Sequence, residues 1–294
     1  MKTISKRKKM TTFDIVNYIF MAFVCCIVLY PFLYLLKVSL SSMDSFNIPS
    51  LSIIPETIDF RSYAKVLENK FVVLGFRNTL LRVILGTPLT LIATVLAAYP
   101  LSKKHFPNRV FWTGILVFTM FFDGGLIPTY LLVKNLNLLD SVWALILPRF
   151  IMTFTLVIVR NYFMALPDSL EESAKIDGAG DFYILFFIVI PISAPIIATV
   201  TLWTIVDHWN AWFDSMIYIQ TVQKQVLQVV LRRIVLENSS QIMDLTGAVS
   251  DEAPSNPENI KAAVVMVITI PIVTIYPFLQ KYFVKGILVG SLKG

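Results

Sequence analysis

The chain alternates between long apolar runs and short polar segments. Apolar runs occupy about residues 13–36, 75–100, 110–132, 141–163, 191–219 and 261–284. Roughly 20 apolar residues are enough for a helix to cross the hydrocarbon core of a bilayer. Lipid also requires the backbone polar groups of such a segment to be paired internally. The pattern therefore predicts an all-α membrane protein with six transmembrane helices, formed by residues 1–294 as a single domain.

The first apolar run follows a basic start, as the core of a signal peptide does. It is longer than a signal-peptide core, and no small-residue cleavage site follows it directly. We therefore expect a retained first helix at about 13–36 and core helices between about 75 and 284. Two longer polar loops are predicted at about 37–72 and 221–260, the second containing a helix-like segment, LQVVLRRIVLEN, before a flexible polar turn.

The composition changes the function classes to consider. Hydrophobic residues make up 56% of the chain and charged residues 15%, whereas soluble domains carry about 25% charged residues. The net charge is +6, but the basic residues do not form a stripe with aromatic residues, so nucleic-acid binding is not expected. They concentrate instead in short connections on the side of the termini, at 2–9 and 103–109. The positive-inside rule then predicts a multi-pass membrane protein with both termini cytoplasmic and both long loops facing outward.

One polar stretch, residues 166–190, lies between the fourth and fifth apolar runs on the predicted cytoplasmic side. Asp168 is expected to cap a short helix, with Glu171 three residues later as its capping-box partner. Glu171 and Lys175 are four residues apart, a spacing that favours an ion pair on one helix face.

Two glycines divide this stretch. Gly178 and Gly180 are expected to end the first helix, and Asp181 to cap a second, mostly apolar helix. The segment is therefore predicted to be a helix–bend–helix hairpin that offers a short acidic face to another protein.

No catalytic or metal-binding motif is found in the sequence. It lacks the GxxxxGK[ST] phosphate loop, the HExxH helix and the GxSxG elbow, and it has two histidines. We therefore expect no catalytic residue, no metal ligand and no enzymatic activity in this chain. Energy for any work it does must come from a partner or an ion gradient.

The hairpin sequence resembles the EAA loop of permeases in binding-protein-dependent ABC importers. Glu172-Ser173-Ala174 is followed after three residues by Gly178, and after nine more by the segment 188–191, Ile-Val-Ile-Pro. The family pattern has Ala at the second position and Leu before the proline, so Ser173 and Ile190 depart from it. Residues 175–179, within this pattern, resemble the carbohydrate-uptake, maltose-permease-like branch of the family. Within that branch, the blocks 121–148 and 208–214 resemble permeases for aldouronate or alginate oligosaccharides.

This resemblance implies a type I importer permease of the bacterial cytoplasmic membrane that moves oligosaccharides by alternating access. Its implied partners are a homologous permease in a heterodimer, two copies of a cytoplasmic ATPase, and an extracellular sugar-binding protein received by the outward loops. No cofactor is expected on this chain, because ATP and Mg would bind the ATPase. The hairpin would be the coupling helix that docks on the ATPase. Its coupling residues would be Glu171, Glu172, Ser173, Ala174, Asp177, Gly178 and Ala179.

A second group of residues is a candidate for the substrate path. Ionisable residues inside a span usually face a cavity or a partner, and tryptophan rings suit the C–H faces of sugars. The residues considered are Trp203, Asp207, Trp209, Asn210 and Arg149. For the tryptophans, an aromatic belt at the outer interface is an equal alternative, and for Trp212 the belt is favoured.

Three arginines, Arg77, Arg82 and Arg149, lie in or near the predicted spans. Arg77 and Arg82 are expected to extend to the membrane interface. Arg149 is expected to pair with Asp207 or Asp214, or to contact an acidic sugar.

Two other classes of protein remain open at this point. An ion-coupled secondary transporter would show two related halves and acidic residues near mid-span, and neither is clear here. A polytopic membrane enzyme would need convergent catalytic side chains, for which Asp207 with His208 is a poor candidate.

Overall fold

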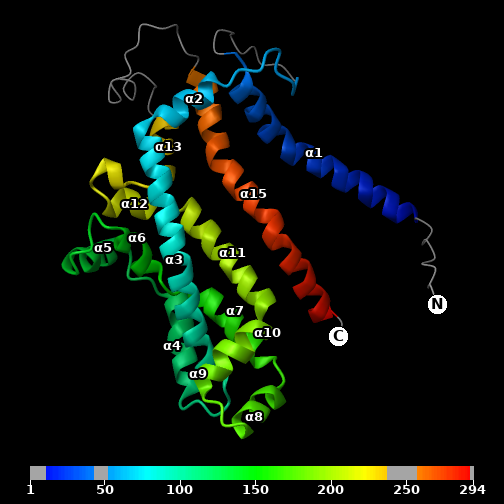
Figure 1. Cartoon of the computed structure of the whole chain (residues 1–294), viewed down its shortest axis with the longest axis vertical. Helices are drawn as coiled ribbons and strands as arrows, with labels where there is room; N and C mark the ends of the chain where they lie inside the picture. Colours follow the sequence, from blue (N-terminus) through cyan, green and yellow to red (C-terminus); the bar gives the residue numbers. More distant parts are fainter. Residues whose placement is uncertain (1–10, 43–51, 237–256, 292–294) are drawn as a thin grey trace. The chain divides into compact units, whose positions relative to one another are not determined.

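The structure, a computed structural model, describes residues 11–42, 52–236 and 257–291, all in helices or irregular segments with no strand among them. The chain forms two compact units: Met1–Glu68 with Ser239–Val267, and Asn69–Asn238 with Ile268–Gly294. Figure 1 shows the helices of both. Three helices are long and apolar enough to cross a membrane, and three bent helix pairs pass the same test together, which gives up to six spans in the described residues.

The first unit contains α1 (Thr12–Leu40), α2 (Arg61–Glu68) and the start of α15 (Pro257–Ser291). Thr11 and Asp14 form a capping box at the start of α1. At the other end, the Ser39 hydroxyl lies 2.7 Å from the Tyr63 hydroxyl of α2, and the Asn259 amide donates to the Ser41 carbonyl at 2.8 Å. The end of α1 is thus tied to α2 and to the beginning of α15.

The second unit is built around α3 (Lys70–Ser102), which packs against α7 (Thr153–Met164), α11 (Ala194–Asn210) and α13 (Leu227–Leu236). The remaining elements are α4 (Arg109–Phe121), α5 (Leu126–Asn135), α6 (Val142–Ile146), η1 (Leu147–Arg149), α8 (Asp168–Ile176), α9 (Asp181–Tyr183), η2 (Ile184–Val189), α10 (Ile190–Ile192), α12 (Phe213–Tyr218) and η3 (Val222–Lys224). The core combines buried apolar side chains of α3, α7, η2 and α11, for example Ala98, Val159, Ile184 and Val200.

The boundaries of the long helices differ from those predicted. The first helix runs to Leu40 rather than 36, and α3 begins at Lys70 rather than 75 because the Asn69 side chain accepts hydrogen bonds from the Phe71 and Val72 amides. The helix predicted in the second polar loop is confirmed as α13, while residues 237–256 lie outside the described part. The tail is helical to Ser291, and residues 292–294 are outside the described part.

Three of the predicted spans are not single straight helices. The run at 110–132 bends by 111° between α4 and α5, where Gly125 has a φ of +87°. The run at 141–163 bends by 52° after Pro148, and the run from 191 follows an 84° bend at Ser193, between Pro191 and Pro195. Glycine admits the left-handed backbone and proline removes a helix hydrogen bond, so these residues break helices that hydropathy alone joins.

Candidate functional site

A cavity of about 610 Å³ lies within the second unit. Its walls come from the 122–125 turn, α5, the end of η1, the last residues of α11, and α12. The lining includes the charged residues Asp123, Arg149, Asp207 and Asp214 and the polar residues Thr129, Asn210, Trp212 and Tyr218. Three of the five residues predicted for a substrate path, Arg149, Asp207 and Asn210, therefore meet in one cavity.

Arg149 and Asp207 face each other across this cavity. The guanidinium Nη1 lies 3.7 Å from Asp207 Oδ2, and the two side chains are 49% and 29% exposed. The pairing expected for Arg149 is confirmed. The distance exceeds that of a normal hydrogen bond, so Arg149 keeps donors available to a ligand.

The tryptophans are distributed differently from the prediction. Trp203 is 41% exposed and does not line the cavity. Trp209 is buried, with its ring 5.8 Å from that of Phe76 in an edge-to-face contact, so it belongs to neither the cavity wall nor an exposed belt. Trp212 does line the cavity, and the Arg232 guanidinium lies 4.2 Å from its ring centroid. Trp212 is therefore the aromatic side chain of this group that a ligand can reach.

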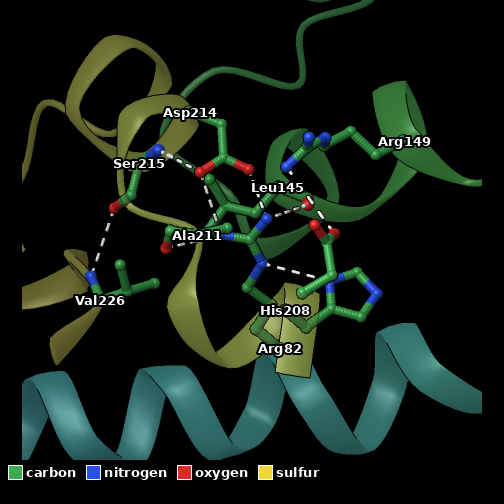
Figure 2. Close-up of polar contacts among 9 residues, drawn as sticks. Arg82, Leu145, Arg149, His208, Ala211, Asp214, Ser215 and Val226 are labelled. Atoms are coloured by element: carbon green, nitrogen blue, oxygen red, sulfur yellow. Dashed lines mark hydrogen bonds and ion pairs between the residues drawn. The ribbon is translucent and has the colours of Figure 1, made fainter. Parts of the chain in front are cut away.

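Arg82 lies beneath the cavity and does not extend to the interface as predicted. Its side chain is fully buried and forms an ion pair with Asp214, with Nη1 3.0 Å from Asp214 Oδ1. Figure 2 shows the guanidinium also donating to the carbonyl oxygens of Leu145 and Ala211. A buried charge is stable only when it is paired and hydrogen-bonded. At this position on α3, the Arg82 side chain reaches partners on both α6 and α12. In the sequence, this buried ion pair is indicated by Asp214, the acidic residue that follows the tryptophan-rich end of α11.

The neighbouring His208 fixes how closely α3 and α11 approach. Its Nδ1 accepts a 3.4 Å hydrogen bond from Arg82 Nε (Figure 2). A Cβ atom on Gly86 of α3 would lie 2.6 Å from His208 Nε2. Only glycine therefore lets the imidazole ring sit against the α3 backbone.

Asp140 anchors the segment that follows α12. Its carboxylate accepts hydrogen bonds from the Thr221 amide at 2.9 Å, the Thr221 hydroxyl at 2.7 Å and Lys224 Nζ at 2.8 Å. Its own amide donates to the carbonyl of Tyr218, a cavity-lining residue. Burial opposes ionisation of this carboxyl, but the hydrogen bonds from Lys224 and Thr221 outweigh it and lower the pKa of Asp140 to about 2.

Asp140→Asn is expected to lower the free energy of unfolding by about 1 kcal/mol at neutral pH, since the anchor is partly exposed. An unfolded aspartate has a pKa of about 3.9. Because the folded pKa is lower, the contribution is present above about pH 4 and disappears as the pH falls towards 2. Thermal unfolding in detergent across this range measures it. A difference between the two proteins that is unchanged at pH 2 would contradict the role of the charge. Asparagine is the suitable replacement because the backbone φ here is +59°.

The second candidate site is the hairpin, which is formed by α8 and by the helical segment Asp181–Ile192 that comprises α9, η2 and α10. Gly178 has a φ of +83°, its amide donates to the Lys175 carbonyl, and the Ala179 amide donates to the Ala174 carbonyl. This is the Schellman motif, which closes a helix with a left-handed glycine. The predicted glycine bend is confirmed.

The predicted caps and ion pair of the hairpin are wrong. Asp168 is the first residue of α8, with no capping hydrogen bond, and its carboxylate lies 2.9 Å from Lys104 Nζ. Lys175 lies 3.5 Å from Asp181, not beside Glu171. Likewise Gly180, rather than Asp181, is the N-cap of α9. Charged partners outside α8 replaced the local ones that spacing favoured.

The hairpin residues divide between an outer and an inner face. Glu172, Ser173, Asp177 and Gly178 are exposed. Ala174 and Ala179 pack against the apolar core of the second unit, and the Glu171 side chain is 15% exposed in an ion pair with Lys103. Ile176 and Phe182 are 86% and 73% exposed, although neither was predicted as a site residue. The sequence could have indicated them, because each is an apolar residue at a position where a solvated helix would carry a polar one.

The sequence of this chain matches the family described as "Binding-protein-dependent transport system inner membrane component" over residues 83–289. The chain belongs to this family. This permease therefore works with an ATPase and a binding protein and is not an enzyme. Membership also decides against an ion-coupled secondary transporter and a membrane enzyme.

Individual relatives cover almost the whole permease. It is 39% identical over 292 residues to Protein LplC of Bacillus subtilis strain 168, covering 99% of this chain and 98% of that protein. It is 39% identical to the polygalacturonan/rhamnogalacturonan transport system permease protein YtcP of the same organism, covering 96% and 98%. A chain in the crystal structure of a bacterial ABC transporter involved in the import of the acidic polysaccharide alginate superposes with a TM-score of 0.83 at 30% identity, covering 94% of this chain and all of that one.

Proposed function

We propose that this permease carries acidic oligosaccharides across the cytoplasmic membrane through the cavity lined by Arg149, Asp207 and Asn210. The observation that carries the proposal is the half-exposed Arg149 guanidinium, which lines the cavity and lies 3.7 Å from Asp207 Oδ2. The names of two similar proteins, one for polygalacturonan and rhamnogalacturonan and one for alginate, support an acidic sugar.

The chemistry of the cavity suits such a substrate. Arginine donors match the two oxygens of a carboxylate, so a uronate group can take the place of Asp207 at Arg149. Asp207 and Asn210 can then accept hydrogen bonds from sugar hydroxyls, and the Trp212 ring offers an apolar face to the sugar C–H groups. The displaced Asp207 carboxylate stays in the cavity without its counter-charge, so the sugar hydroxyls that donate to it are part of the binding.

Arg149→Gln is expected to reduce uptake of galacturonate oligosaccharides by about tenfold, the loss of one charged hydrogen-bonded contact. Arg149→Lys should retain more of the uptake, and Trp203→Ala is the matched control, because Trp203 is on α11 but outside the cavity. Uptake into cells expressing the complete transporter measures the effect. An equal loss in Trp203→Ala, or unchanged uptake in Arg149→Gln, would contradict the proposed path.

We further propose that the exposed face of the hairpin docks on the ATPase. Glu172, Ser173 and Asp177 offer polar groups, and Ile176 and Phe182 offer apolar area to a groove. ATP and Mg would bind the ATPase and not this chain. Two ATPase copies, a homologous permease in a heterodimer, and cytoplasmic termini complete the proposed assembly. Gly178 is the residue whose replacement tests the docking most directly, because it sets the shape of the hairpin.

The opposite side of the membrane is proposed to receive the sugar-binding protein. The polar segments at 37–72 and 221–260 contain α2, η3 and α13 in their described parts. Asp140 and Lys224 hold the start of the second segment close to the cavity-lining α12. A binding protein seated there would release its sugar near the cavity.

A further inference from the structure

Glu171 differs from the other acidic residues of α8 in the direction of its side chain. Asp168 is 70% exposed, whereas Glu171 is 15% exposed and forms an ion pair with Lys103, itself 16% exposed. Lys103 directly follows the last residue of α3, Ser102. The pair therefore joins the hairpin to the end of the longest helix of the second unit, which Figure 1 shows running from α13 to the level of α8 and α9.

The end of α3 that carries Lys103 is held firmly. Lys103 Nζ lies 4.4 Å from the Tyr99 ring centroid, and that ring makes an edge-to-face contact with Phe163 of α7 at 6.4 Å. Arg160 of α7 donates to the Leu101 carbonyl at 3.0 Å. A displacement of Lys103 is therefore expected to move α3 and α7 together.

The other end of this connection reaches the cavity. Arg82 lies on α3, 21 residues before Lys103, or about 32 Å along a helix. Its guanidinium forms an ion pair with Asp214 and donates to the carbonyl of Ala211, and both of these residues line the cavity. A displacement of the α3 end can therefore be transmitted to the cavity wall by one continuous helix and one buried ion pair.

We infer that the Lys103–Glu171 ion pair positions α8 on α3 and transmits its movement, so that Glu171 acts inside the permease and is not a contact for the ATPase. The inference rests on the proposed docking of the hairpin. Two neighbouring acidic residues then have different roles. Glu172, on the exposed face, is available to the ATPase, whereas Glu171 is paired with Lys103.

The second ion pair of this region provides a matched control. Lys104 and Asp168 also join the 103–108 connection to α8, at 2.9 Å, but their side chains are 83% and 70% exposed. Solvent screens such a pair and leaves it little energy. Lys104→Met removes the same charge one residue away, from an ion pair that contributes little interaction energy.

The test compares Lys103→Met, Glu171→Gln and Lys104→Met in the assembled transporter, reconstituted with its ATPase and binding protein. We expect the first two variants to keep the ATPase in co-purification while uptake of galacturonate oligosaccharides per ATP hydrolysed falls by about tenfold. Lys104→Met should stay within about twofold of the parent protein. The uptake-to-hydrolysis ratio is the decisive readout, because a merely misfolded permease would lose membrane abundance and ATPase together.

Charge reversal provides the second measurement. Lys103→Glu and Glu171→Lys should each lose coupling, and the double variant should recover part of it, an interaction that a double-mutant cycle isolates. Recovery is expected to be partial, because a carboxylate at 103 would face the negative surface of the Tyr99 ring.

Each contrary outcome has a distinct meaning. Loss of the ATPase from Glu171→Gln, with Lys103→Met unaffected, would make Glu171 a direct contact and overturn the inference while leaving the docking intact. Normal coupling in both single variants would overturn it as well. An ATPase that fails to co-purify with the parent permease would instead refute the proposed docking itself.

Discussion

Asp214→Asn is expected to lower the free energy of unfolding of the permease by about 3 kcal/mol or more, because it leaves the Arg82 guanidinium buried without a counter-charge. Arg82 is fully buried, and its other acceptors are the neutral carbonyls of Leu145 and Ala211 and the ring of His208. Thermal unfolding of the purified protein in detergent measures the loss, and the amount of permease recovered from membranes should fall with it.

Asp207→Asn is the control for this experiment. It removes a carboxylate from the same cavity, but its partner Arg149 is half exposed, so the expected cost is below about 1 kcal/mol. Replacing both members of the buried pair, as in Arg82→Met with Asp214→Leu, should restore part of the stability, because no unpaired charge remains. Equal stability of Asp214→Asn and Asp207→Asn would contradict the structural role of the buried pair.

Gly178→Asp is expected to abolish transport and release the ATPase while leaving the permease in the membrane. Gly178 occupies the left-handed position of the Schellman motif that ends α8, where an L-residue is strained by about 1–2 kcal/mol. The new carboxylate would also lie at the negative end of the helix dipole. Since a Cβ at this position meets no atom within 4 Å, the loss would come from the shape of the hairpin and not from a clash.

Gly180→Asp separates backbone conformation from charge. Gly180 has an ordinary φ of −77°, and a Cβ there also meets no atom within 4 Å. As the N-cap of α9 it is a position that aspartate suits, so transport and ATPase co-purification should be retained. Normal uptake by Gly178→Asp would refute the docking of the hairpin, and equal loss in both variants would assign the effect to charge.

Features that depend on local or one-dimensional physics could be predicted from the amino-acid sequence. Apolar runs predicted helices that fit a bilayer, and these are present as α1, α3, α15 and the three bent pairs. The spacing of Glu172, Gly178 and the proline at 191 located the hairpin, and the φ of Gly178 agrees with the predicted bend. These predictions held because transfer into lipid and the freedom of a glycine act on a residue whatever surrounds it.

The pairing of the charged side chains could not be predicted from the sequence, because it depends on how distant helices pack. Spacing along α8 favoured Glu171 with Lys175, but Lys103, 68 residues away, occupies Glu171 instead. Arg82 was expected at the interface and is buried with Asp214, 132 residues away. Local spacing offers an ion pair worth a few tenths of a kcal/mol, and a partly buried partner with less solvent screening outweighs it. The cavity and the inner connection of the hairpin follow from such long-range pairs, which only the packing of α3 against α7, α11 and the hairpin brings together.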